Sequence, residues 1–140
     1  MTLKTSIGSK GSPKAMFASF VNNVSTDSKP SCSSGGCKGS CRASALTRLN
    51  REGMAACQAG DYGVAERLLE KGIDLANRCG SKMYVAKLRN NLGLVHLLAG
   101  RPLDASGQFW QALELVEGKL GRDNPLFRRI EGNLLRASGN

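Results

Sequence analysis

The chain has 140 residues, of which 20 are lysine or arginine and 11 are aspartate or glutamate, so its formal net charge is +9. This length leaves room for one modest hydrophobic core, and the positive charge favours acidic partners. No apolar run is long enough to cross a membrane, and no paired carboxylates, Ser/His/Asp set or phosphate-binding glycine loop is recognisable. We therefore predict a protein that is not an enzyme and does not span a membrane.

The cysteine content and the amino terminus favour a reducing compartment. The five cysteines are an odd number, which argues against a secreted scaffold held together by disulfides. The amino terminus lacks the continuous apolar stretch of a secretory signal, so we expect a cytoplasmic location. We do not expect nucleic acid as a partner, because no aromatic stacking platform or binding motif accompanies the basic residues.

Residues 1–41 are predicted to form a flexible basic tail. They contain ten serines and five lysines but a single acid, Asp27. Such a segment buries too little apolar surface to offset the entropy that ordering would cost. Within the tail, residues 14–24 place Phe17 and Phe20 on one side of a short amphipathic helix. We expect this segment to dock on a partner, on a membrane surface or on the rest of the chain.

Three cysteines in the tail, Cys32, Cys37 and Cys41, form a second feature of interest. Clustered thiolates bind zinc, copper(I) or an iron–sulfur cluster, although this spacing matches no established ligand motif. Reversible disulfide chemistry or thiol modification is an alternative, and so is the absence of any assigned role. The single histidine, His96, falls in a predicted helix, and we expect a packed side chain there rather than a metal ligand.

The remaining residues, 42–140, are predicted to form α-helices at 42–58, 62–78, 82–99, 102–119 and 125–137. Gly60 and Gly100 lie just past apolar-periodic segments, where a left-handed residue commonly ends a helix. Asp61 then suits the N-cap of the next helix. Cys57 and Cys79 lie among alanine and leucine in these helices, so we expect both to pack as small hydrophobes.

A repeat runs through this helical region. Gly53, Gly60 and Ala65 recur as Gly93, Gly100 and Ala105, each 40 positions later. A glycine inside a helix costs about 1 kcal/mol relative to alanine, which is tolerated where two helices must approach closely. The recurrence therefore predicts two tightly packed antiparallel hairpins, with the alanines of the second helices facing the glycines of the first.

The pattern resembles the tetratricopeptide repeat. The matching residues are Leu92-Gly93, Gly100, Ala105, Phe109 and Ala112 in the second unit and Gly53, Gly60-Asp61-Tyr62, Ala65, Leu69 and Gly72 in the first. The spacing is longer than the usual period of the family and is similar to the extended repeats of kinesin light chains. The resemblance implies an all-α helical-hairpin solenoid over residues 42–140, with two hairpins and a C-terminal capping helix.

In tetratricopeptide domains the first helices of successive hairpins line a concave groove. The resemblance places these groove positions at Asn50, Met54, Lys87, Asn90, Asn91, Leu94, Arg129, Asn133 and Arg136, together with Cys57 and Leu97. Asparagine amides donate to and accept from an extended peptide backbone, and lysine and arginine favour acidic side chains.

The resemblance thus implies a non-catalytic adaptor that binds a protein or peptide segment, an acidic one by charge, without a cofactor. The alternative is a metal-binding or thiol-redox-responsive protein that uses Cys32, Cys37 and Cys41 and selects its client through the repeats. So short an array leaves apolar surface uncovered, which makes a homodimer a further expectation.

Overall fold

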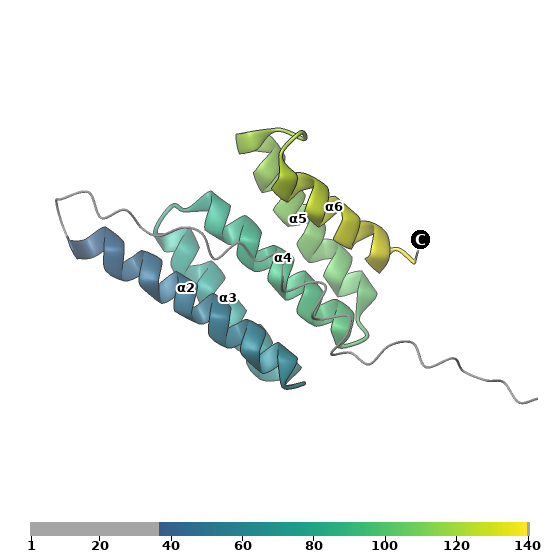
Figure 1. Cartoon of the computed structure of the whole chain (residues 1–140), viewed down its shortest axis with the longest axis horizontal. Helices are drawn as coiled ribbons and strands as arrows, with labels where there is room; N and C mark the ends of the chain where they lie inside the picture. Colours follow the sequence, from purple (N-terminus) through teal and green to yellow (C-terminus); the bar gives the residue numbers. More distant parts are fainter. Residues whose placement is uncertain (1–36, 140) are drawn as a thin grey trace, which may run out of the picture. The chain divides into compact units, whose positions relative to one another are not determined.

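The computed structural model describes residues 37–139, with side chains described from residue 42 onward. These residues form α2 (Cys37–Gln58), α3 (Tyr62–Arg78), α4 (Lys82–Leu98), α5 (Pro102–Leu120) and α6 (Pro125–Ala137), and no strand occurs among them. Successive helices run antiparallel and lie side by side (Figure 1). The predicted all-α hairpin architecture is therefore confirmed. Residues 1–36 of the predicted tail, including the segment 14–24, lie outside the described residues.

The helix boundaries agree with the prediction to within one residue except at the start of α2. That helix begins at Cys37, whereas residue 42 was the predicted first position. No proline separates Cys37 from the apolar-periodic part of the helix, and extending an existing helix adds one hydrogen bond for each residue fixed. The backbone of residues 37–41 thus belongs to α2 rather than to a loop.

The first three turns between helices share one geometry. Gly60, Gly80 and Gly100 have φ of 86°, 67° and 77°, a left-handed conformation that L side chains rarely adopt. In the first turn, Gly60 N donates to Cys57 O at 3.1 Å and Asp61 N donates to Ala56 O at 2.9 Å. This pair of bonds is a Schellman motif, and it recurs after α4 with Arg101 N donating to His96 O at 2.8 Å.

The caps that begin the helices agree only in part with the prediction. Asp61 occupies the N-cap position of α3, as predicted, but its side chain makes no capping hydrogen bond. The Schellman turn at Gly60 and Asp61 already fixes the direction in which the chain enters α3. Asn124 does cap α6, since its Oδ1 accepts from Leu126 N at 2.9 Å.

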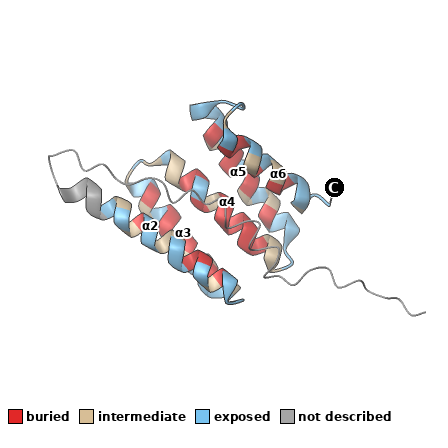
Figure 2. Cartoon of the chain, in the orientation of Figure 1, coloured by how far each residue is buried: buried red, intermediate tan, exposed pale blue. Residues whose placement is uncertain are grey.

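The core is centred on α4, which contacts each of the other four helices. Every residue from Asn90 to His96 is buried, and Figure 2 shows buried residues along much of α4. The largest fully buried side chains are Phe109, Leu69, Leu88, Ile130, Val95 and Val116. Each contributes about 1.5 to 3 kcal/mol through burial of apolar surface.

The repeated glycines account for the close packing within each hairpin. A Cβ atom added at Gly53 would lie 2.9 Å from Leu69 Cγ, and one added at Gly93 would lie 2.5 Å from Phe109 Cε1. The predicted close approach is confirmed, but the large side chains Leu69 and Phe109 occupy the space, rather than the alanines alone. None of the helices in the described part combines the length and hydropathy needed to cross a bilayer.

Candidate functional site

All the predicted groove residues lie on α2, α4 and α6. These helices share one face of the domain, because α4 contacts both α2 and α6 directly. On this face, α6 contributes the basic residues Arg129 and Arg136, and α4 contributes the asparagines Asn90 and Asn91.

A chain of side-chain hydrogen bonds crosses all three helices. Asn91 Nδ2 donates to Asn50 Oδ1 at 2.6 Å, and Asn90 Nδ2 donates to Asn91 Oδ1 at 3.3 Å. On the other side, Asn133 Nδ2 donates to Asn90 Oδ1 at 2.9 Å. Arg136 Nη1 donates to Asn133 Oδ1 at 3.3 Å. We call these four amides and Arg136 the asparagine chain.

The asparagine chain has a single direction. A guanidinium only donates, so the atom of Asn133 that faces Arg136 is its oxygen. That choice leaves the Asn133 nitrogen facing Asn90, and the same reasoning fixes Asn91 and Asn50 in turn. Hydrogen bonds aligned in this way polarise one another, which strengthens each of them.

Burial makes these bonds important for stability. Asn90, Asn91 and Asn133 are only 6%, 5% and 3% exposed. A buried amide without a partner costs roughly 1 to 3 kcal/mol, whereas a bonded one is tolerated. The asparagine chain therefore holds α2, α4 and α6 together as well as lining their common face.

The structure places the predicted groove residues in three environments. Met54, Asn90, Asn91, Leu94 and Asn133 are buried, Asn50 and Arg129 are half-buried, and Lys87 and Arg136 are exposed. The first five lie where α4 meets its neighbours, and the other four are accessible from the surface. Lys87 Nζ lies 5.7 Å from the centroid of the Tyr84 ring, a cation–π distance. As binding residues, all nine stay a prediction.

The other two groove positions and the isolated cysteines are consistent with packing. Cys57 is 3% exposed, and burial raises the pKa of its thiol to about 11. Its sulfur is therefore protonated at neutral pH and fills space as a small apolar group. Leu97 and Cys79 are both half-buried, and Cys57 and Cys79 are free thiols.

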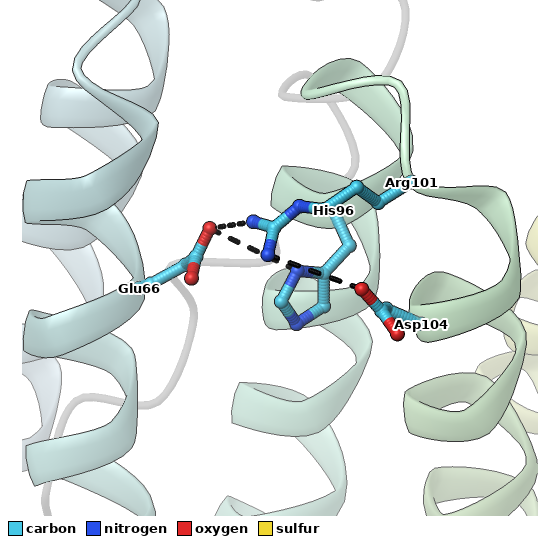
Figure 3. Close-up of polar contacts among 4 residues, drawn as sticks. All are labelled: Glu66, His96, Arg101 and Asp104. Atoms are coloured by element: carbon cyan, nitrogen blue, oxygen red, sulfur yellow. Dashed lines mark hydrogen bonds and ion pairs between the residues drawn. The ribbon is translucent and has the colours of Figure 1, made fainter.

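An ionic cluster that sequence reasoning missed joins the two hairpins (Figure 3). The guanidinium of Arg101, in the turn after α4, is bonded to Glu66 of α3, and its Nη1 lies 3.9 Å from Asp104 Oδ2. His96 Nδ1 lies 3.8 Å from Glu66 Oε1. No sequence motif indicates this cluster, because Glu66 and Arg101 are 35 positions apart.

His96 is buried in this cluster, as predicted for a packed side chain. Burial lowers its pKa below the ordinary value of 6.5, while Asp104 and Glu70 act in the opposite direction. Its Nδ1 has no hydrogen-bond partner. The imidazole is therefore neutral at neutral pH and sits beside an Arg–carboxylate pair without joining it.

The cysteine cluster of the tail remains a prediction. Cys32 lies outside the described residues, and for Cys37 and Cys41 only the helical backbone is described. Among the residues whose side chains are described, no group of three or more His, Cys, Asp or Glu side chains is arranged to hold a metal ion. That finding does not bear on the three tail cysteines.

Two antiparallel hairpins with glycine contacts at equivalent positions, followed by one more helix in the same register, define a helical-repeat domain. A family model described as tetratricopeptide repeat matches residues 43–118, which covers α3 and α4, most of α2 and nearly all of α5. The chain belongs to the tetratricopeptide repeat family, whose members act in protein–protein interaction. A search of curated proteins found no match.

Proposed function

We propose that the protein is a non-catalytic adaptor that binds an acidic segment of a partner protein along α2, α4 and α6. The observation that carries this proposal is the asparagine chain, which ends on Arg136, an exposed residue. Membership of the tetratricopeptide repeat family supports protein binding in general, and the charge and amides of this face suggest which chemistry is bound.

The basic end of the asparagine chain suits a carboxylate. Arg136 donates to the neutral amide oxygen of Asn133 at 3.3 Å, a long bond. Hydrogen bonds between a guanidinium and a carboxylate are shorter, frequently bidentate and about twice as strong. An acidic side chain of a partner would therefore compete well for Arg136, while Lys87 on α4 supplies a second exposed cation.

The middle of the asparagine chain suits a peptide backbone. Each amide carries two donor hydrogens and an oxygen with two lone pairs, so none is saturated by its neighbour in the chain. A peptide lying across α4 could add a hydrogen bond to half-buried Asn50 without breaking the bond that Asn50 accepts from Asn91. The direction of the asparagine chain favours an orientation in which the acidic end of the peptide lies over α6.

Two further features complete the proposal. The 40-residue spacing of Gly53 and Gly93 supports assignment to the extended, kinesin-light-chain-like form of the repeat. The free thiols of Cys57 and Cys79 support a reducing setting such as the cytoplasm.

Charge reversal on the two faces of the domain tests the proposal. Acidic peptides selected from a displayed random library would be labelled and titrated with the full chain by fluorescence anisotropy. We expect Lys87→Glu and Arg136→Glu each to weaken binding about tenfold, the loss expected for one charge-assisted hydrogen bond. Far-ultraviolet circular dichroism would show that each variant remains folded.

Matched controls come from α3, which contributes no residue to the asparagine chain. Arg67 and Lys71 are both exposed on that helix, so Arg67→Glu and Lys71→Glu make the same change of net charge elsewhere. We expect these variants to bind like the wild type. Equal weakening by both pairs would mean that overall charge, and not this face, attracts the peptide, and it would overturn the proposal.

A further inference from the structure

Each hairpin contains a glycine that receives a large side chain from the helix that follows. Gly53 on α2 lies under Leu69 of α3, and Gly93 on α4 lies under Phe109 of α5. At either position a Cβ atom would come within 3.0 Å of the covering side chain, at 2.9 Å and 2.5 Å. Close contact with the next helix is thus the reason that glycine occupies these helix interiors.

Gly132 occupies the equivalent place on α6. It follows Gly93 by 39 positions, and the same offset relates Phe127 to Leu88, both of which are buried. Yet a Cβ atom added at Gly132 would meet nothing within 4 Å. Within residues 37–139 no helix follows α6. No helix of residues 37–139 therefore covers the third glycine of the series.

Apolar side chains are exposed around this position. By the offset of 39 positions, Leu135 of α6 corresponds to His96 of α4. By the offset of 40 positions that relates the two hairpins, Trp110 of α5 corresponds to Glu70 of α3. Glu70 and Asp104 both act electrostatically on His96, so α3 and α5 both approach that position. His96 is 8% exposed, whereas Leu135 is 54% and Trp110 is 63% exposed.

Four residues of α6 lie on the side of the helix that carries Gly132. Arg128, Glu131, Gly132 and Leu135 are spaced by three, four and seven positions and share one side of the helix. We call these four residues the Gly132 face. Three of them are exposed, and Gly132 is half-buried. The asparagine chain runs along the neighbouring side of α6, and the two surfaces meet at Arg136, four positions after Gly132.

We propose that the Gly132 face binds an amphipathic helix of a partner protein, which places a leucine or phenylalanine over Gly132. The helices α3 and α5 show the required pattern, since each has an alanine four residues before its covering side chain, at Ala65 and Ala105. A partner helix of this pattern would cover Leu135 as α5 covers His96. It would continue the same helix packing by one further layer.

Charge determines which helix fits best. The Gly132 face carries Arg128, which lies 3.7 Å from Asp123, and Glu131, while Arg136 adjoins this face and the whole chain has a net charge of +9. A second copy would bring like charge to the interface, which disfavours self-association. The partner helix is therefore one with acidic residues beside its apolar stripe, as α5 has Asp104, Glu114 and Glu117.

A peptide with the α5 sequence, residues 102–120, is a suitable probe because it carries both the Ala-x3-Phe pattern and acidic residues. The labelled peptide would be titrated with the full chain. We expect saturable binding that falls at least about tenfold when Gly132→Leu fills the contact position. A peptide carrying Phe109→Ala should bind weakly to the wild type.

The matched control is Gly118→Leu. Gly118 also lies in a helix, is exposed, and has nothing within 4 Å of an added Cβ. We expect this variant to bind the peptide like the wild type. Unchanged binding by Gly132→Leu, or equal binding by the Phe109→Ala peptide, would overturn the proposal.

Two other occupants would be recognised in the same experiment. Light scattering that shows a dimer of the full chain, lost in Gly132→Leu, would assign the Gly132 face to a second copy. Higher peptide affinity in a Phe17→Ala, Phe20→Ala double variant would assign it to residues 14–24. Either result overturns the partner-helix proposal. The Gly132→Leu and Phe109→Ala experiments do not involve Lys87 or Arg67. If the partner-helix proposal fails, the charge-reversal test of the α2, α4 and α6 face is therefore unaffected.

Discussion

Replacing Gly93 with alanine isolates the contact on which the second hairpin depends. The added Cβ would lie 2.5, 2.8 and 2.9 Å from Phe109 Cε1, Cδ1 and Cζ. Phe109 is completely buried, so its ring cannot move aside without displacing α4 or α5. Overpacking of this kind costs about 1 to 3 kcal/mol, and three contacts below 3.0 Å with a rigid ring favour the upper end.

The helix propensity of alanine offsets part of that cost. Alanine is better than glycine in a helix interior by about 1 kcal/mol. We therefore expect Gly93→Ala to lower the free energy of unfolding by about 2 kcal/mol, the difference between an overpacking cost of about 3 and the propensity gain of about 1. For a domain of about 100 residues this corresponds to a fall in Tm of roughly 8 to 16 °C.

Gly132→Ala is the matched comparison, because the same residue change meets open space there. We expect it to raise the free energy of unfolding by about 1 kcal/mol. Gly53→Ala should fall between the two, since the flexible Leu69 side chain has more freedom to shift than a phenylalanine ring. Urea unfolding of the full chain, followed by circular dichroism, measures all three. A Gly93→Ala variant as stable as Gly132→Ala would refute the reasoning from close helix packing.

Three other predictions concern buried polar groups. Asn90→Leu leaves the Asn133 amide without its acceptor and should cost about 1 to 3 kcal/mol in urea unfolding; an unchanged midpoint would mean that the asparagine chain does not hold the helices together. His96 has a lowered pKa in the folded state, so the folded state binds fewer protons than the unfolded state, and stability should fall as pH drops below about 6.5. His96→Asn should reduce this fall, with Glu66, Glu70, Asp104 and Arg101 left in place; an identical pH profile would assign the loss to the carboxylates instead. Cys57, whose pKa is raised to about 11, should resist alkylation at neutral pH while half-buried Cys79 reacts, as peptide mass analysis would reveal; equal labelling of both thiols would contradict its burial.

The sequence was sufficient to predict most of the fold because local signals and the repeat agree. Glycines at positions 60, 80 and 100 adopt positive φ, which is why they stand where helices end. Gly53 and Gly93 identify the close helix contacts. The first residue of α2 was missed because the glycine and serine content of residues 37–41 favours a loop locally, whereas continuity with a long helix favours the helical backbone.

The candidate site was predictable in position but not in its interactions. The glycine register places Asn50, Asn90 and Asn133 on one face. It does not reveal that Asn91 pairs with Asn50 across 41 positions, or that Asn133 pairs with Asn90 across 43. Such pairs depend on the distance and rotation between neighbouring helices, which no local pattern encodes. The cluster of Glu66 with Arg101 was missed for the same reason.

The central claim is that the face formed by α2, α4 and α6 binds an acidic peptide through the asparagine chain. The most direct measurement is a two-dimensional nitrogen–proton spectrum of the full chain during peptide titration, with the side-chain amide signals of Asn50, Asn90, Asn91 and Asn133 assigned. We expect these signals to shift in proportion to the bound fraction and Arg67→Glu to leave the shifts unchanged. Saturable binding with these four amide signals unmoved would contradict it.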